Sequence, residues 1–246
     1  KITITMETQN LNKIYQRLER KYSEIMTSNF DDLTNDEIYD QHAKLLVTCG
    51  SITLAKEFKN FIVDDYNKKI LRFLLYYFNN CKLAEDVFPE KEYKIHKNIM
   101  FCGEVGVGKT LIMQAFSDYL VLTNNPNRFY NLSVTQMINY YKLNNHLDKY
   151  TYNEMNTETF EGQPYNICLN DVGMQTHLHF GTDTKTIVTD FFHARNEIWC
   201  QQGKFAHITT NLAPSEIKDY FSDEHGRLID RFKTYNVLHL QGESRR

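Results

Sequence analysis

Before residue 97 the hydrophobic positions recur three or four residues apart, which is the spacing of helices. A first stripe runs from Leu11 to Met26 and predicts one amphipathic helix. Thr34 followed by Glu37 is typical of a capping box, so we expect a second helix to begin there. A third helical run covers Leu54 to Asn79, and the charged stretch after Pro89 leads into the rest of the chain.

After residue 97 short apolar runs alternate with helical segments. The predicted strands are Asn98–Cys102, Arg128–Leu132, Tyr165–Leu169, Phe205–Thr210 and Val237–Leu240. The predicted helices are Lys109–Leu122, Thr135–Leu143, Thr184–Trp199 and Pro214–Phe221. This alternation predicts an α/β fold, in which a parallel sheet is covered by helices on both faces. The segment Asn144–Pro164 has no periodicity, and we expect it to be a surface excursion.

Composition narrows the class of protein. No apolar run approaches the roughly 18 residues that a membrane span needs, and the N-terminus has no apolar core of the kind found in signal peptides. The cysteine count of 5 is odd and includes no CxxC pair, which indicates buried, reduced thiols. We therefore expect a soluble, cytoplasmic protein with no membrane partner.

Charge gives a weaker signal. The net charge of −3 does not indicate a basic nucleic-acid-binding domain. A local excess of basic residues occurs only near the end of the chain, where Asp230 and Glu243 are outnumbered by Arg227, Arg231, Lys233, Arg245 and Arg246. Both a basic surface and ordinary solvated charges fit this pattern.

The strongest chemical signal is the motif Gly103-x-x-x-x-Gly108-Lys109-Thr110. It lies between a predicted strand and a predicted amphipathic helix, which is the context of a phosphate-binding loop. Glycines let backbone N–H groups turn toward phosphates, and the helix N-terminus adds partial positive charge. We expect Lys109 to reach the β- and γ-phosphates of ATP and Thr110 to ligate Mg²⁺. The predicted nucleotide-binding residues are Gly103, Glu104, Val105, Gly106, Val107, Gly108, Lys109 and Thr110.

A second signal is the apolar run that ends in Asn170 and Asp171. P-loop ATPases of the AAA+ class usually end this strand with two acids, the first for Mg²⁺ and the second for the attacking water. With Asn170 in the first position, we expect weaker Mg²⁺ retention and slow hydrolysis, with Asp171 as the catalytic acid. Shifting the alignment by one residue makes Asp171 the metal-side acid and puts Val172 in the catalytic position. The candidate metal ligands are therefore Thr110, Asn170 and Asp171, and a core strand that ends in a polar turn is the alternative.

Two further signals follow in chain order. Asn211 closes the strand Phe205–Thr210, which is the place of a sensor that orients water or reads the γ-phosphate; a cap for the next helix is the alternative. Arg231, and as second choice Arg227, precede the last strand, where an arginine finger can reach the γ-phosphate of a neighbouring subunit. The alternative for Arg231 is a surface salt bridge with Asp230.

These motifs resemble the DnaC/IstB-type AAA+ ATPases, which are helicase loaders and transposition helpers. The resemblance runs from Phe61 to Arg246, and a weaker part of it is Arg195, late in the helix before the sensor strand. Besides the P-loop, it is carried by Leu169-Asn170-Asp171-Val172-Gly173, Thr209-Thr210-Asn211-Leu212, Leu228-Ile229-Asp230-Arg231-Phe232 and the ending Gly242-Glu243-Ser244-Arg245-Arg246.

The resemblance implies an AAA+ P-loop NTPase domain with a five-stranded parallel sheet over residues 61–246. It also implies a separate partner-binding region, for which the helical residues 1–60 are the candidate. A replicative helicase as partner, contact with single-stranded DNA and self-assembly through Arg231 follow from the same resemblance.

The leading hypothesis is therefore an ATPase switch in DNA replication, similar to a helicase loader. A transposition helper of the same fold is the runner-up. The absence of an acid at Asn170 motivates a third hypothesis, a scaffold that binds ATP without hydrolysing it. A small-molecule P-loop kinase is the least favoured, because it has no use for Asn211 and Arg231.

Overall fold

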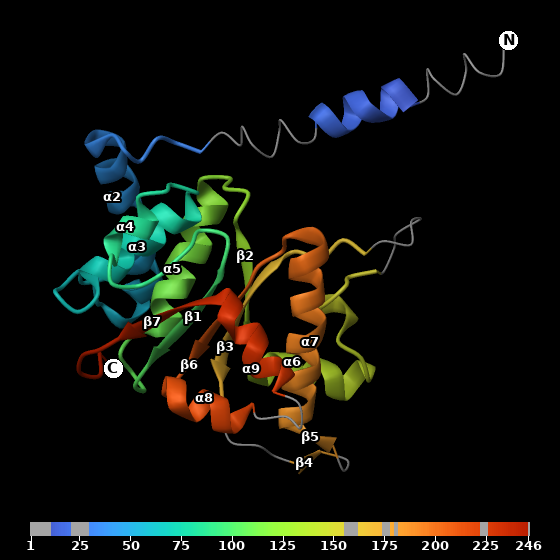
Figure 1. The fold of residues 1–246 in the computed structure, drawn as a ribbon. Coiled ribbons are helices and arrows are strands. Elements are labelled where there is room, and N and C mark those ends of the chain that lie inside the picture. The colour runs from blue at the N-terminus through green and yellow to red at the C-terminus, as the bar shows by residue number, and fades with distance from the viewer. Residues whose placement is uncertain are drawn as a thin grey trace, which may run out of the picture. The chain divides into compact units, whose positions relative to one another are not determined.

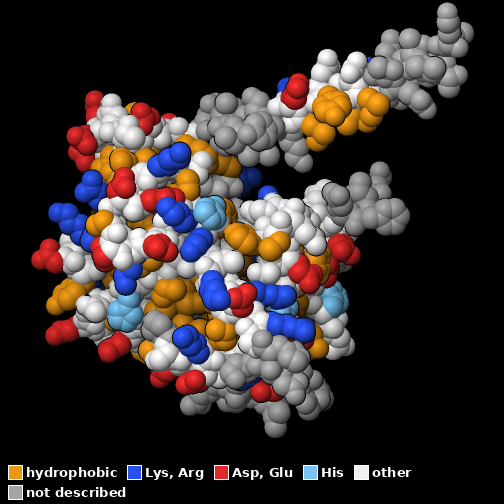
Figure 2. Space-filling view, viewed as in Figure 1, with side chains coloured by type: hydrophobic (Ala, Val, Ile, Leu, Met, Phe, Trp, Pro, Cys, Tyr) orange, Lys and Arg blue, Asp and Glu red, His pale blue; other side chains and the backbone are white. Residues whose placement is uncertain are grey.

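The computed structural model describes residues 11–20, 30–154, 162–173, 178–179, 182–221 and 226–245. The chain divides into two units, Lys1–Asp31 and Asp32–Arg246. In the first unit, residues 11–20 form a helix, as predicted for this part of the stretch from Leu11 to Met26, and residues 21–26 lie outside the described part of the chain. Leu11, Ile14, Tyr15 and Leu18 of this helix are exposed. Figure 2 shows the hydrophobic side chains of the helix gathered along one side. Among the described helices, none has the length and apolar character needed to cross a membrane.

The second unit is built on a five-stranded sheet in the order β2-β3-β6-β1-β7. All four neighbouring pairs run parallel. The strands are β1 Asn98–Gly103, β2 Phe129–Ser133, β3 Asn166–Val172, β6 Ala206–Thr210 and β7 Tyr235–Leu240. The predicted α/β fold with a five-stranded parallel sheet is thereby confirmed.

Helices cover both faces of this sheet (Figure 1). One face packs against α2 Asp36–Leu54, α3 Lys68–Phe78, α4 Ala84–Val87 and α5 Lys109–Leu122. The other packs against α6 Val134–Asn144, α7 Thr184–Gln202, α8 Pro214–Tyr220 and α9 Arg227–Arg231. Short 3-10 turns follow α2, α6 and α9, namely η1 Ala55–Glu57, η2 Asp148–Tyr150 and η3 Phe232–Thr234. A small antiparallel pair, β4 Leu178–His179 and β5 Thr182–Asp183, precedes α7.

Alternating residues of the strands supply two separate cores, because successive side chains of a strand point to opposite faces. Ile99 and Phe101 of β1 lie in the core on the α5 side, whereas Met100 and Cys102 lie in the core on the α7 side. All four are fully buried or nearly so. A central strand must therefore be apolar at every position, which is why its sequence shows a continuous apolar run.

Three local predictions differ from the structure. The N-cap of α2 is Asn35, whose side chain accepts from the N–H groups of Glu37 and Ile38, so the Thr34 capping box is wrong by one residue. The helix predicted over residues 54–79 is wrong, because the chain leaves helical geometry at Phe58 (φ 55°) and re-enters it only at α3. Cys200 is exposed, although the thiols were expected to be buried.

The larger unit includes α2, which packs against α5. The division at residue 60 assigned this helix to the N-terminal region. A partner-binding role for residues 1–60 stays a prediction. Of the predicted surface excursion Asn144–Pro164, residues 155–161 lie outside the described part of the chain.

Candidate nucleotide-binding site

The loop between β1 and α5 has a backbone that only glycine adopts without strain. Gly106 and Gly108 have φ values of 87° and 105°, in the left-handed region. Gly103 is required for a different reason, since a Cβ there would clash with the carbonyl oxygen of Leu240 on β7. The glycines of the predicted phosphate-binding loop thus allow its curvature and its close contact with the neighbouring strand.

Lys109 is the first residue of α5, and its side chain is turned back into the loop. Its ammonium group donates to the carbonyl oxygens of Gly103 and Glu104 and to Oδ1 of Asn211, each at 2.7 Å. The side chain is only 5% exposed. These contacts join the phosphate-binding loop to the end of β6, so that Lys109 and Asn211 act on the same pocket.

This pocket, which we call the phosphate pocket, has a volume of about 190 Å³. It is lined by Val105, Gly106, Gly108, Lys109, Thr110, Leu111, Asp171 and Asn211. A lysine ammonium and the N-terminus of a 14-residue helix meet here, and both favour an anion. The pocket therefore has the electrostatics of a phosphate site, with one carboxylate, that of Asp171, on its opposite wall.

A bulge in β3 positions Asp171. Leu169 pairs with Ile208 and Val172 with Thr210, so β3 carries one residue more than β6 over this stretch. Asp171 has a φ of 62°, and its backbone N–H donates to Oγ1 of Thr209 at 3.1 Å. Bulges re-aim side chains where a sheet meets an active site, and here the bulge directs Asp171 to the pocket.

Asn170 lies on the interior side of the same bulge. Its Nδ2 donates to Oδ1 of Asn131 on β2 at 2.8 Å, and its Oδ1 accepts from Oγ1 of Thr209 at 3.1 Å. The side chain is 4% exposed and is not among the described residues that line the phosphate pocket. Both ends of its amide are engaged with neighbouring strands rather than with the pocket.

The amide of Asn170 belongs to a chain of hydrogen bonds whose direction is fixed at its far end. Asn131 Nδ2 donates to Oε1 of Gln114 at 3.1 Å, and Gln114 Nε2 donates to Oδ1 of Asp118 at 2.9 Å. An ionised carboxylate only accepts hydrogen bonds. Each amide must therefore point its NH₂ group toward Asp118, and residue 170 has to be a donor.

The close of β6 packs on the turn after β3. Thr210 Oγ1 donates to the carbonyl oxygen of Val172 at 2.7 Å and accepts from the N–H of Leu212 at 3.1 Å. Leu212 then covers Gly173, where φ is 91° and a Cβ would clash with the leucine side chain. Since α8 has its N-cap at Ala213, the helix-cap alternative for Asn211 does not apply.

A second, more apolar pocket of about 390 Å³ adjoins the phosphate pocket and shares Gly108 and Leu111 with it. Its other lining residues are Leu54, Lys59, Asn60, Phe61, Ile62, Asn67, Val107, Ile112 and Arg245. Its volume and apolar lining are those of a small-molecule site. No sequence motif predicts this pocket. One of its walls is formed by residues 59–67, which lie inside the segment predicted to be helical.

Close packing on α2 holds that wall in place. A Cβ on Gly50 would lie 2.5 Å from the ring of Phe61, so the ring occupies space that only glycine leaves. The backbone N–H of Phe61 donates to Oγ of Ser51 at 3.1 Å, and Nδ2 of Asn67 donates to the carbonyl oxygen of Ile62 at 2.8 Å. The sequence signal for this packing is the glycine at position 50, inside a helical pattern.

The two candidate finger residues lie on α9. Arg231 contacts Nδ1 of His193 on α7, and Asp230 pairs with Lys233 at 2.5 Å, so the Arg231–Asp230 bridge does not form. Arg227 is exposed at the start of α9. Neither arginine is among the described residues lining the phosphate pocket of its own chain. A role at a neighbouring subunit stays a prediction.

Buried polar groups at the opposite end of the sheet serve packing. Arg195 is 1% exposed, and its guanidinium donates to the carbonyl oxygens of Tyr165 and Phe205, before β3 and β6 begin. Burial lowers its pKa to about 10. Burial also lowers the pKa of His207, near the start of β6, to about 3, so this side chain is neutral near pH 7. Arg195 therefore lies away from the carboxyl ends of the strands, where the phosphate pocket is.

No protein-family model matches the chain, and no curated protein has a significant sequence match to it. Solved structures do resemble it. The crystal structure of the DnaC helicase loader has a TM-score of 0.48 and 18% identity, over 73% of this chain and 92% of that one. A putative primosome component from Streptococcus pyogenes serotype M3 has a TM-score of 0.48 and 13% identity, over 74% and 84% of the two chains. Domain III of the Thermotoga maritima replication initiation protein DnaA has a TM-score of 0.47 and 20% identity, over 74% and 65%.

Proposed function

We propose that the chain binds ATP with Mg²⁺ and hydrolyses it slowly, as an AAA+ ATPase that switches between assembly states. The observation that carries the proposal is the position of Lys109, held by Gly103, Glu104 and Asn211 at the floor of a pocket that Asp171 also lines. A cation, a helix N-terminus and a single carboxylate around one small pocket suit a triphosphate and its metal ion.

Different parts of one nucleotide would bind in the two adjoining pockets. The phosphate pocket would take the triphosphate. The apolar pocket of about 390 Å³ beside Val107 and Leu111 would take the base and sugar, and it is called the base pocket for this reason. Apolar and aromatic side chains such as Phe61 offer surface to a planar base. Because both pockets share Gly108, a single nucleotide would fill the two together.

The residues present fit Mg²⁺. Thr110 offers a hydroxyl and Asp171 a carboxylate, both hard oxygen ligands of the kind that Mg²⁺ takes together with phosphate oxygens. The ion would neutralise charge on the transferred phosphate. Asp171 would also orient the attacking water, and Asn211, which accepts a hydrogen bond from Lys109, would sense the γ-phosphate. With Asn170 turned into the interior, one carboxylate serves both tasks, which supports slow turnover.

The proposed biological role is that of a helicase-loader-like protein. This part rests on the sequence motifs that resemble the DnaC/IstB type, above all Thr209-Thr210-Asn211-Leu212 and the Gly-Glu-Ser-Arg-Arg ending. A replicative helicase and single-stranded DNA are the partners that the resemblance implies, in the cytoplasm. A transposition helper of the same fold is the second candidate, and an ATP-binding scaffold the third.

Binding and hydrolysis are tested separately. Lys109→Ala should weaken binding of a fluorescent ATP analogue at least about tenfold, because charge-assisted bonds to phosphate are lost. Asp171→Asn should keep binding and lose steady-state phosphate release. Unchanged ATP affinity in Lys109→Ala would disprove the phosphate site, and phosphate release that persists in Asp171→Asn would disprove the catalytic assignment. Pull-down with a replicative helicase and, in parallel, with a transposase separates the loader from the transposition helper.

A further inference from the structure

A short strap, defined as Gln241–Arg245, follows β7 and lies along the phosphate-binding loop. The backbone N–H of Arg245 donates to the carbonyl oxygen of Gly106 at 3.0 Å. Ser244 fills the space beside the same glycine, where a Cβ would clash with its hydroxyl. The strap therefore contacts the loop at the point where its backbone turns toward the phosphate pocket.

The side chain of Arg245 continues from there across the beginning of α5. Its Cδ lies 3.6 Å from the position that a Cβ on Gly108 would take. Its Nη2 donates to Oδ2 of Asp64 at 2.6 Å, with the two side chains 28% and 33% exposed. Arg245 lines the apolar pocket, and it is not among the described residues that line the phosphate pocket.

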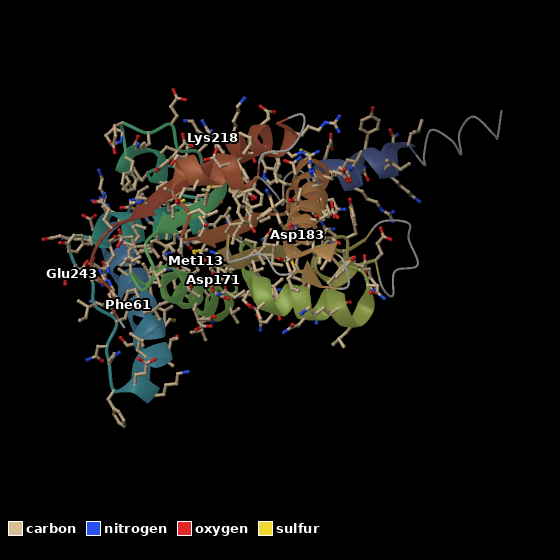
Figure 3. The ribbon with its side chains drawn as sticks, turned by 90° about the horizontal axis from the view of Figure 1, so that it is seen from below. Phe61, Met113, Asp171, Asp183, Lys218 and Glu243 are labelled. Carbon is tan, nitrogen blue, oxygen red and sulfur yellow. The ribbon has the colours of Figure 1, made fainter. Side chains whose placement is uncertain are left out.

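Asp64 is itself fixed in the wall of the apolar pocket. Its Oδ1 accepts from the N–H groups of Tyr66 and Asn67 at 3.0 and 3.1 Å, and its own N–H donates to Oδ1 of Asn67 at 3.0 Å. The strap reaches this wall a second time, since a Cβ on Gly242 would lie 3.4 Å from the ring of Tyr66. In Figure 3 the labels Phe61 and Glu243, which mark the wall and the strap, lie close together at the left of the view, whereas Asp183 lies farther to the right.

We propose that the Asp64–Arg245 ion pair is a latch that holds the strap across the base pocket, so that release of a bound nucleotide requires this pair to open. The proposal rests on the proposed nucleotide site. Because Arg245 borders the base pocket and not the phosphate pocket, the latch acts on the part of the nucleotide that ATP and ADP share. It is a positioning device, and it takes no part in the chemistry.

The test measures release of N-methylanthraniloyl ATP and ADP by stopped-flow displacement. Asp64→Asn removes the charge and keeps an Oδ1 acceptor for the turn, and Arg245→Gln removes the charge of the other partner. Each should speed release of both nucleotides about fivefold, the size expected of a partly exposed ion pair. The double variant should be no faster than either single variant, because both act by breaking one contact. Release from the unaltered protein should also accelerate with salt more steeply than release from Arg245→Gln, because only the unaltered protein has the ion pair to be screened in addition to the phosphate contacts.

A matched control is Glu57→Gln, which breaks the ion pair of Glu57 with Lys59, at 3.0 Å, beside the same pocket. It should leave the release rates unchanged. Arg245→Lys keeps the charge and should release nucleotide more slowly than Arg245→Gln. Unchanged release in both neutral variants would overturn the latch, as would faster release that is confined to ATP, because Arg245 would then act on the γ-phosphate. If the unaltered protein binds neither nucleotide, the proposed function fails first, and that result is recognisable before any variant is made.

Discussion

Restoring the acid that the strand end lacks should damage this protein. In Asn170→Asp, the side chain at position 170 loses the NH₂ group that donates to Oδ1 of Asn131 at 2.8 Å. A carboxylate oxygen then faces a carbonyl oxygen inside a site where the native side chain is only 4% exposed. The amide of Asn131 cannot simply turn over, because Gln114 and Asp118 fix its direction.

The expected cost comes from a buried, unsatisfied polar group. Removing one partner of a buried hydrogen bond costs about 1–3 kcal/mol, and more when a charge remains, so we expect a loss of at least about 3 kcal/mol in the free energy of unfolding near neutral pH. Thr209 Oγ1 can still donate to this carboxyl, but burial and the facing carbonyl oxygen of Asn131 raise its pKa above the unfolded value. The loss should therefore be small at acidic pH, where the group is protonated in both states, and should grow as the pH rises through the unfolded pKa.

A second substitution should repair the first. With Asp118→Asn added, the far end of the chain is a donor as well as an acceptor, so all the amides can reverse. Asn131 would then donate to the carboxylate at position 170, and the pair should lose less stability than the sum of the two single variants. Urea unfolding at pH 5 and pH 8 measures all four proteins, with phosphate release as the second readout. If Asn170→Asp alone is as stable as the unaltered protein and hydrolyses ATP faster, the carboxylate faces the pocket and the reasoning is wrong.

Three further predictions concern other parts of the unit. Burial lowers the pKa of His207 to about 3, so below the ordinary histidine pKa of about 6.5 the folded state binds fewer protons than the unfolded state. The free energy of unfolding should therefore fall by about 2 kcal/mol from pH 7 to pH 5. Urea midpoints test this, and His207→Gln should make the free energy of unfolding depend less on pH. Gly173→Ala should cost about 2 kcal/mol in the same assay, since φ is 91° and Leu212 fills the space; full stability would contradict this packing. Arg231→Ala should keep ATP affinity and lower turnover of the assembled protein about a thousandfold, whereas unchanged turnover would exclude the finger role.

The parts of the fold that depend on local pattern could be predicted from the sequence. The helix Lys109–Leu122 has the predicted bounds, and the five strands differ from prediction by a few residues at their ends. Parallel strands buried on both faces give continuous apolar runs, and the loop that follows β1 is a recognisable glycine pattern. These signals are contained within a few neighbouring residues.

The apolar pocket and the position of Asn170 depend on contacts between segments that are not adjacent in the sequence. Phe61 fits against Gly50, and Arg245 reaches Asp64 from the other end of the chain. Residues 54–79 show helical spacing throughout, yet the chain turns at Phe58 with a φ of 55°, where tertiary packing overrides local propensity. The sequence shows Asn170 and Asp171 as two adjacent polar residues after an apolar run. It does not show that a bulge directs Asp171 to the pocket and Asn170 to the interior.

In the proposed ATPase, the same bulge would account for strong binding groups beside a reduced set of catalytic groups. Lys109 and the start of α5 lie on one side of the phosphate pocket and favour negative charge there, whether or not hydrolysis occurs. The opposite side has one carboxylate, because residue 170 completes a hydrogen-bond chain that ends at Asp118. An acid at position 170 would weaken the contact between β2 and β3 before it could help the chemistry. Packing of the sheet edge and the slow turnover that we propose would therefore be consequences of one residue, and a protein that works by its nucleotide-bound state would tolerate that combination better than a motor would.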